Sequence, residues 1–276
     1  VLSHGADGIG LFRSEFLFMN SAGLSTEDEQ YETYSRVLEE MDGKSVTIRT
    51  LDIGGDKTIP DLEGFDEENM LLGWRAVRFC LSRKDIFKTQ LRALLRASVH
   101  GNLQIMFPLI SGIEELHSVL EVLEETKQEL SEENISFRNS IPLGIMVEVP
   151  SAALTSDILA KNVDFFSIGT NDLIQYTIAV DRGNEKIAYL YEPFHPGVLR
   201  LIKMIVENAH EQGIPVGMCG EMGGDPFSTV ILLGMGLDEL SMSSVGVPEI
   251  KKIIRSVSLS EAEELVGTIM DMRSYV

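Results

Sequence analysis

Short runs rich in apolar and β-branched residues alternate with longer segments in which apolar residues recur every three or four positions. The short runs predict strands, and the longer segments predict amphipathic helices. The seven predicted strands cover residues 8–12, 46–50, 103–107, 143–147, 165–169, 216–219 and 239–243. The clearest helices are predicted at 84–98, 113–130, 197–210 and 248–256. Strands that alternate with helices in this way indicate a parallel α/β fold.

The fold class that this alternation favours is α/β, a (β/α)8 TIM-type barrel formed as one domain by residues 1–276. A closed barrel of this type needs eight strands and the pattern supplies seven, so we expect the first strand upstream of Val1. Val1 is not an initiator methionine, which favours a fragment of a longer protein. Two long irregular stretches, 52–74 and 180–196, are expected to be functional or disordered loops.

The charge balance excludes several classes of partner. Aspartate and glutamate outnumber lysine and arginine by 43 to 23, which gives a formal net charge of −20. Such a surface repels nucleic acids and anionic membranes. Only two cysteines are present, so no disulfide framework is expected, and a reducing, cytoplasmic location fits. No apolar run reaches the roughly 18 residues that cross a bilayer.

Unusual polar residues lie where five of the predicted strands end. They are Arg13, Arg49, Glu148, Asn171 with Asp172, and Cys219. In a (β/α) barrel the carboxyl ends of the strands face a common bowl, which is where active sites lie. A solvated loop charge would explain any one of these residues more simply. The same placement on five strands favours a functional site.

Five cations on this strongly acidic chain suggest an anionic ligand. They are Arg13, Arg49, Lys57, Arg75 and Arg182. Guanidinium groups bind phosphate and carboxylate oxygens through two parallel hydrogen bonds. Five cations exceed what one phosphate requires and suit a ligand that carries both phosphate and carboxylate. For Arg75, a surface ion pair with an acidic residue near Trp74 is an equally good interpretation.

The carboxylates Glu148 and Asp172 follow neighbouring predicted strands and offer two hard oxygen ligands. Mg²⁺ typically takes one or two carboxylates and completes its octahedron with substrate oxygens and water. The pair therefore predicts a Mg²⁺ site. A general acid/base pair is the alternative, but it does not explain the surrounding cations.

The two cysteines differ in their surroundings. Cys219 lies at a strand end, and a thiol with a pKa of about 8.5 can serve as an acid. Taken alone, a packing role explains Cys219 better, and Cys80 lies inside an apolar helical stretch where packing is expected. Gly8-Ile-Gly10 lacks the third glycine of a dinucleotide fingerprint, and no phosphate-binding Gly-Lys-Ser/Thr motif is present. The five histidines form no metal-ligand pattern.

At these residues the sequence resembles the family of phosphoenolpyruvate (PEP)-utilising enzymes over essentially its whole length. The similar segments are Gly8-Ile-Gly-Leu-Phe-Arg-Ser-Glu-Phe, Arg49-Thr-Leu-Asp-Ile-Gly-Gly-Asp-Lys, Gly73-Trp-Arg-Ala, Gly144-Ile-Met-Val-Glu, Asp164-Phe-Phe-Ser-Ile-Gly-Thr-Asn-Asp-Leu, Val180-Asp-Arg-Gly-Asn and Gly217-Met-Cys-Gly-Glu. Within the family, Asp52-Ile-Gly-Gly-Asp-Lys looks like the phosphotransferase branch of bacterial sugar uptake rather than the dikinases.

The resemblance implies roles for individual residues. Glu148 and Asp172 become Mg²⁺ ligands, and Cys219 becomes the acid that protonates the enolate to give pyruvate. The implied substrate contacts are Arg13, Arg49, Lys57, Arg75, Asn171, Asp172 and Arg182. The implied reaction moves the phosphoryl group of PEP to a histidine on a separate N-terminal domain, which then serves a small phosphocarrier protein. Homodimers are also implied.

Three alternatives remain open from the sequence. The chain could be a fragment of a dikinase, which a nucleotide-binding domain in the upstream region would reveal. It could be a lyase on the same barrel that works through a metal enolate, although such an enzyme has less need of so many cations. It could also bind PEP without catalysis.

Overall fold

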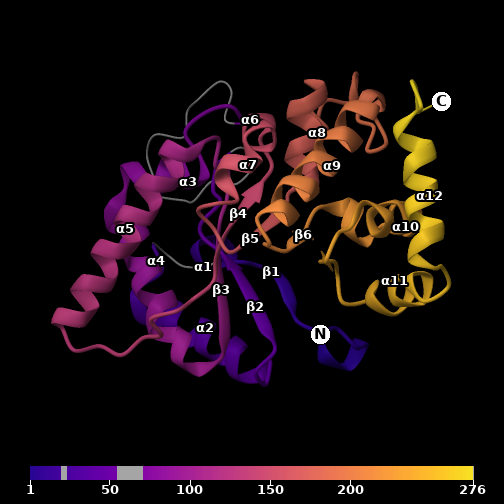
Figure 1. The fold of residues 1–276 in the computed structure, drawn as a ribbon. Coiled ribbons are helices and arrows are strands. Elements are labelled where there is room, and N and C mark those ends of the chain that lie inside the picture. The colour runs from indigo at the N-terminus through magenta and orange to yellow at the C-terminus, as the bar shows by residue number, and fades with distance from the viewer. Residues whose placement is uncertain (20–23, 55–70, 276) are drawn as a thin grey trace. The chain divides into compact units, whose positions relative to one another are not determined.

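The computed structural model describes residues 1–19, 24–54 and 71–275. The chain forms two compact units (Figure 1). The N-terminal unit is Leu11–Leu143, and the C-terminal unit combines Val1–Gly10 with Gly144–Val276. Strand β1 (Ile9–Arg13) spans the boundary between them in the sequence. Both units alternate strands with helices.

The N-terminal unit is built around two parallel strands. β2 (Ser45–Arg49) pairs with β3 (Asn102–Phe107) in a register that sets Arg49 opposite Met106. α4 packs against α2 on one side and α5 on the other, which buries its apolar face. The helices of this unit are α1 (Phe16–Met19), α2 (Glu27–Glu40), α3 (Ala76–Ser82), α4 (Lys84–Ala97), η2 (Ser98–His100) and α5 (Ile113–Glu132).

The C-terminal unit carries four parallel strands that pair in chain order. They are β4 (Leu143–Val147), β5 (Phe165–Ile168), β6 (Val216–Met218) and β7 (Glu239–Leu240). Helices α6 and α7 pack on α9, and α12 packs on α10. The helices are η1 (Leu2–His4), α6 (Pro150–Leu154), α7 (Ser156–Leu159), α8 (Thr170–Ile178), η3 (Ala188–Leu190), α9 (Pro196–Glu211), η4 (Glu221–Gly224), α10 (Pro226–Met235), α11 (Val247–Ile254) and α12 (Leu259–Met270).

The register of this sheet aligns the carboxyl ends of three strands. Val147 pairs with Ile168, and Ile168 pairs with Met218. The next residue on each strand is therefore Glu148, Gly169 or Cys219, and these three lie side by side. Because neighbouring strands are about 4.8 Å apart, groups on these ends can act on one small ligand.

The predicted fold class, an α/β chain of the TIM-type barrel, is confirmed: parallel strands pair in the order in which they follow one another. All seven predicted strands lie within one or two residues of those described, except that the last is shorter and ends at Leu240. The four predicted helices are also found. No helix in the described part of the chain combines the length and apolar character needed to cross a bilayer.

Candidate functional site

The carboxylate of Glu148 lies at the end of β4 and is only 2% exposed. It rests against Gly169, the residue that precedes α8: a Cβ atom on Gly169 would lie 2.9 Å from both Cβ and Oε2 of Glu148. The absence of a side chain at Gly169 therefore lets the buried carboxylate approach the start of α8. This contact joins the ends of β4 and β5.

Asp172 lies in the first turn of α8, three residues after Gly169. A carboxylate is favoured there because the unpaired N–H groups at a helix N-terminus carry partial positive charge. Among the described residues, no group of three or more His, Cys, Asp or Glu side chains could hold a metal. Glu148 at the end of β4 and Asp172 in the first turn of the helix that follows β5 offer two hard oxygen donors, a set that fits Mg²⁺, which accepts its remaining ligands from substrate and water.

Cys219 lies at the end of β6, over the end of β5. Its backbone N–H donates to the carbonyl oxygen of Ile168 at 3.0 Å, and its thiol donates to the same oxygen at 3.7 Å. The two contacts hold Cys219 against the end of β5. The next residue, Gly220, has no room for a Cβ atom, which would overlap Oγ1 of Thr170. The loop after β6 thus lies directly on the start of α8.

Arg182 and Asn171 meet at a common carboxylate, that of Glu221. Oε1 of Glu221 lies 3.1 Å from Nδ2 of Asn171 and 3.2 Å from Nη1 of Arg182. The backbone N–H of Arg182 donates to Oε1 of Gln175 at 3.1 Å, which ties this loop to α8. These hydrogen bonds hold Asn171 and Arg182, two of the predicted substrate contacts, close to α8.

Tyr191 closes one side of this group. Its hydroxyl donates to the backbone oxygen of Asn171 at 3.3 Å. Burial raises the pKa of Tyr191 to about 12, the positive charge of Arg182 opposes this shift, and Glu221 and Asp172 add to it. Tyr191 is therefore a neutral hydrogen-bond donor at physiological pH.

In the N-terminal unit, Arg49 is 5% exposed at the end of β2. Its guanidinium forms an ion pair with Glu15 through Nη2, and Nη1 lies 3.0 Å from Oδ2 of Asp52. A buried guanidinium requires such partners, because an unpaired buried charge is strongly unfavourable. The two carboxylates hold the planar group in one orientation.

Arg75 shares Asp52 with Arg49. Nη2 of Arg75 lies 2.9 Å from Oδ1 of Asp52, and Arg75 is 5% exposed, so Arg75 does form an ion pair, but a buried one and not the surface pair of the alternative interpretation. Gly54 has a φ of +114°, and a Cβ atom there would overlap Cβ of Arg75. Asp52 thus sets the separation of the two guanidinium groups by binding one with each carboxylate oxygen.

A buried network of neutral side chains holds the backbone around Arg49. Oγ of Ser14 donates to the backbone oxygen of Arg49 at 2.8 Å. Gln90 donates to Oγ of Ser14 at 2.9 Å and accepts from the backbone N–H of Leu51 at 2.8 Å. The segment that carries Arg49 and Asp52 is therefore fixed on both sides of the strand end.

Two more residues, Arg13 and Lys57, were predicted to contact the substrate. Arg13 is exposed at the end of β1, and Lys57 lies outside the described residues. Sequence reasoning missed Glu15, Asp52 and Glu221 as parts of the site. Each lies within three residues of a predicted site residue, which was the available signal.

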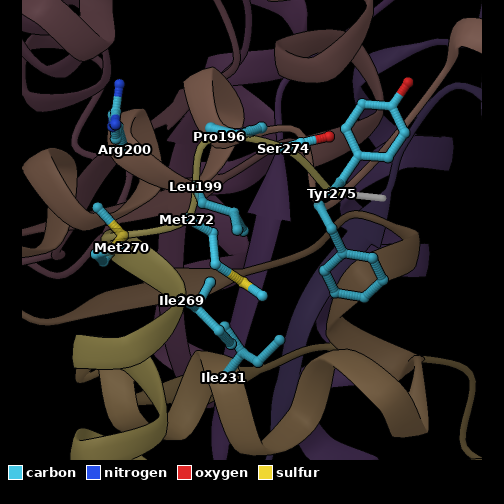
Figure 2. A pocket seen from close by; sticks show the side chains of 10 residues that line it. Pro196, Leu199, Arg200, Ile231, Ile269, Met270, Met272, Ser274 and Tyr275 are labelled. Carbon is cyan, nitrogen blue, oxygen red and sulfur yellow. The ribbon is translucent and has the colours of Figure 1, made fainter.

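An apolar cavity of about 270 Å³ lies elsewhere in the C-terminal unit. Figure 2 shows the side chains of Leu199, Ile231, Ile269 and Met272 gathered in it, while the nitrogen atoms of Arg200 point away from them. None of the predicted site residues that the structure describes lines this cavity. Its apolar walls do not suit a ligand with phosphate and carboxylate groups.

Comparison with known families assigns the chain to a family. Residues 1–259 match the family described as "PEP-utilising enzyme, PEP-binding domain". The chain belongs to this PEP-binding domain family. The match spans both units and includes every strand end described above.

The PEP-binding domain is similar to longer curated relatives. It is 52% identical over 274 residues to the phosphoenolpyruvate-protein phosphotransferase of Priestia megaterium, a match that covers 99% of this chain and 48% of the relative. The protein of the same name from Haemophilus influenzae is 54% identical over 267 residues, covering 97% of this chain and 46% of that protein. This chain thus spans about half the length of these relatives.

Solved structures resemble the PEP-binding domain in fold alone. A malate synthase from Haloferax volcanii matches with a TM-score of 0.58 at 15% identity, over 99% of this chain and 73% of that one. A citrate lyase from Burkholderia xenovorans matches with a TM-score of 0.51 at 16% identity, over 88% of this chain and 68% of that one. The likeness supports the α/β fold and carries no functional argument at these identities.

Proposed function

We propose that this PEP-binding domain takes part in the transfer of a phosphoryl group from PEP to a protein histidine, which releases pyruvate and drives sugar uptake. The observation that carries the proposal is the family match together with the name shared by relatives about half identical to the chain. The enzyme would be a phosphoenolpyruvate-protein phosphotransferase. We further propose that residues 1–276 form one such domain.

The guanidinium groups would bind the phosphate and carboxylate of PEP. Asp52 holds Arg49 and Arg75 as a fixed pair, so little side-chain entropy is lost when an anion binds them. Such preorganised donors stabilise charge on the phosphoryl group as it leaves. The full set of substrate contacts that we propose is Arg13, Arg49, Lys57, Arg75, Asn171, Asp172 and Arg182.

Glu148 and Asp172 would hold a Mg²⁺ ion. When bound, the ion would draw charge from the phosphoryl oxygens and favour cleavage of the bond between phosphorus and the enol oxygen. The burial of Glu148 supports this role because a carboxylate in a low-dielectric environment attracts a cation more strongly than one in water. Asp172, in the first turn of α8, supplies the second oxygen donor.

Cys219 would complete the reaction by protonating the product. Cleavage of the phosphorus–oxygen bond sends the phosphoryl group to a histidine nitrogen and leaves the enolate of pyruvate. The thiol of Cys219 gives its proton to C3 of the enolate, and the resulting thiolate recovers a proton from solvent. The strand register supports this role because it places Cys219 beside Gly169, at the same edge of the sheet as the proposed Mg²⁺ ligand Glu148.

The proposed partners follow from the same relatives. The acceptor histidine would lie on a separate N-terminal domain, which would pass the phosphoryl group to a small phosphocarrier protein. We also propose a homodimer and a cytoplasmic location, which the two free cysteines of the described chain support.

A turnover assay tests the proposed function. Pyruvate formation from PEP is measured for the chain with and without an added histidine-carrying domain from a relative. We expect turnover only when that domain and Mg²⁺ are present. Binding of PEP without turnover in either case would support a simple binding module instead, and a requirement for a nucleotide would support a dikinase.

A further inference from the structure

Glu221 occupies a distinctive position in the C-terminal unit. It begins η4, two residues after Cys219, and its Oε1 atom accepts a hydrogen bond from Asn171 and contacts Arg182, at 3.1 and 3.2 Å. Asn171 and Arg182 belong to different segments, since one lies in α8 and the other in the loop that follows it. One oxygen atom thus fixes the distance between two proposed substrate contacts.

Glu221 also decides how the amide of Asn171 is oriented. The backbone N–H of Glu221 donates to Oδ1 of Asn171 at 2.9 Å, while Oε1 of Glu221 accepts from Nδ2. An N–H group can only donate and a carboxylate can only accept, so the amide has one possible orientation here. Oδ1 of Asn171 therefore faces the backbone of Glu221, and the second Nδ2 hydrogen is left for another acceptor. That orientation suits an anionic ligand.

The exposure of these side chains argues against a mainly stabilising role. The side chain of Glu221 is 78% exposed and that of Arg182 is 45% exposed. Ion pairs this exposed contribute little to stability. They can still restrict two flexible side chains, which lowers the entropy that a ligand loses when it orders them.

We propose that Glu221 is a positioning residue for PEP, because it orients Asn171 and Arg182 toward the anionic groups of the substrate. The inference rests on the proposed function. Glu221 makes no contact with the reacting atoms in this role and acts through its two partners. Its own negative charge opposes an anionic ligand, so the positioning effect must exceed that repulsion.

Calorimetric titration of PEP into the chain with Mg²⁺ tests the inference. We expect Glu221→Ala to weaken PEP binding about tenfold, whereas Glu221→Gln should weaken it only about threefold because the amide oxygen still accepts from Asn171. The matched control is Glu263→Gln, an exposed glutamate on α12 that should leave affinity unchanged. Melting temperatures of all variants should stay close to that of the unmodified chain.

A double-mutant cycle separates positioning from an independent effect. If Glu221 acts through Asn171 and Arg182, Glu221→Ala should change affinity little in a chain that already carries Asn171→Ala and Arg182→Ala. Unchanged or tighter binding by Glu221→Ala alone, or a full additive loss in the cycle, would overturn the inference. Failure of the unmodified chain to bind PEP would instead overturn the proposed function.

Discussion

At the scale of single residues, the same arrangement occurs in both units: an acidic side chain links two proposed substrate contacts. Asp52 links Arg49 to Arg75, and Glu221 links Asn171 to Arg182. The first carboxylate is buried and the second is exposed. Substitutions in the two units should therefore differ, with larger losses of stability around Asp52.

Arg49→Lys should impair the protein despite keeping the charge. An ammonium group lacks the planar fork, so it cannot bind Glu15 and Asp52 together and still present donors to a ligand. We expect PEP binding to fall more than about tenfold, since each charged hydrogen bond contributes about 1.5–3 kcal/mol. Calorimetry of the chain measures this, with the exposed Arg255→Lys as control. Near-normal affinity would mean that Arg49 has a structural role only.

Cys219→Ala should slow the reaction without weakening PEP binding. PEP affinity should stay nearly unchanged, because no charged contact is lost. Protonation of the enolate should slow by roughly 10²–10⁴-fold, the usual value of a general acid. The measurement is deuterium incorporation at C3 of pyruvate by the chain with its histidine-carrying domain, compared with Cys80→Ala as control. Cys80 is 1% exposed and its thiol donates to the backbone oxygen of Leu51 at 3.7 Å, so we expect it to have a packing role. Unchanged incorporation in Cys219→Ala would leave the proton donor unassigned.

The sequence predicted which residues stand at strand ends, because a strand end can be recognised from a local pattern. Arg49 is the last residue of β2, and Glu148 and Cys219 directly follow β4 and β6, as expected. The sequence did not predict which side chains these site residues contact. Glu15 lies 34 positions from Arg49, and Glu221 lies 50 positions from Asn171, so only the folded chain brings them together.

At the scale of elements, the apolar periodicity of the sequence predicted the helices that have one apolar face and missed others. α4 and α9 have clear apolar stripes and match their predictions within a residue or two. α10 was not singled out because Pro226–Met235 is apolar on nearly every face, which leaves no helical period to detect. α2 is mostly polar, and its start depends on the capping box formed by Thr26 and Glu29.

Gly220→Ala should disturb the junction between β6 and α8. The added Cβ would overlap Oγ1 of Thr170, and Thr170 is fully buried, so the loop carrying Cys219 must shift. We expect a loss of about 1–3 kcal/mol in the free energy of unfolding and a strong loss of turnover.

Gly267→Ala is the matched control for this substitution. A Cβ at Gly267 meets nothing within 4 Å, and the residue lies inside α12. The change should therefore stabilise the chain by roughly 0.5–1 kcal/mol. Urea denaturation compares the two variants, and equal stabilities would contradict the described packing at Gly220.

At the scale of the whole molecule, the chain has a net charge of −20, so the cations among the proposed substrate contacts lie on a mostly acidic protein. Arg49, Arg75 and Arg182 are paired with carboxylates, so the anionic ligand would join existing networks. The general acidity of the chain disfavours anions that do not fit these positions. Selectivity for PEP would then depend on geometry and on the metal.

The chain should form a dimer in solution. Large apolar side chains of the C-terminal unit are exposed, among them Tyr189 at 79% and Phe227 at 84%. Exposed apolar groups of this size are typical of association surfaces. Sedimentation at tens of micromolar should give twice the monomer mass of 30.6 kDa. A monomer at that concentration would contradict the proposed homodimer.

The central claim is that this domain binds PEP together with Mg²⁺ at Glu148 and Asp172. Calorimetric titration of PEP into the chain tests it most directly, with Mg²⁺, without Mg²⁺, and in Glu148→Gln and Glu148→Ala. Melting temperatures establish that each variant is folded, and Glu263→Gln controls for the lost charge. The account predicts that PEP binds with Mg²⁺ and that affinity falls sharply in the other three cases. Equal affinity in all of them would contradict it.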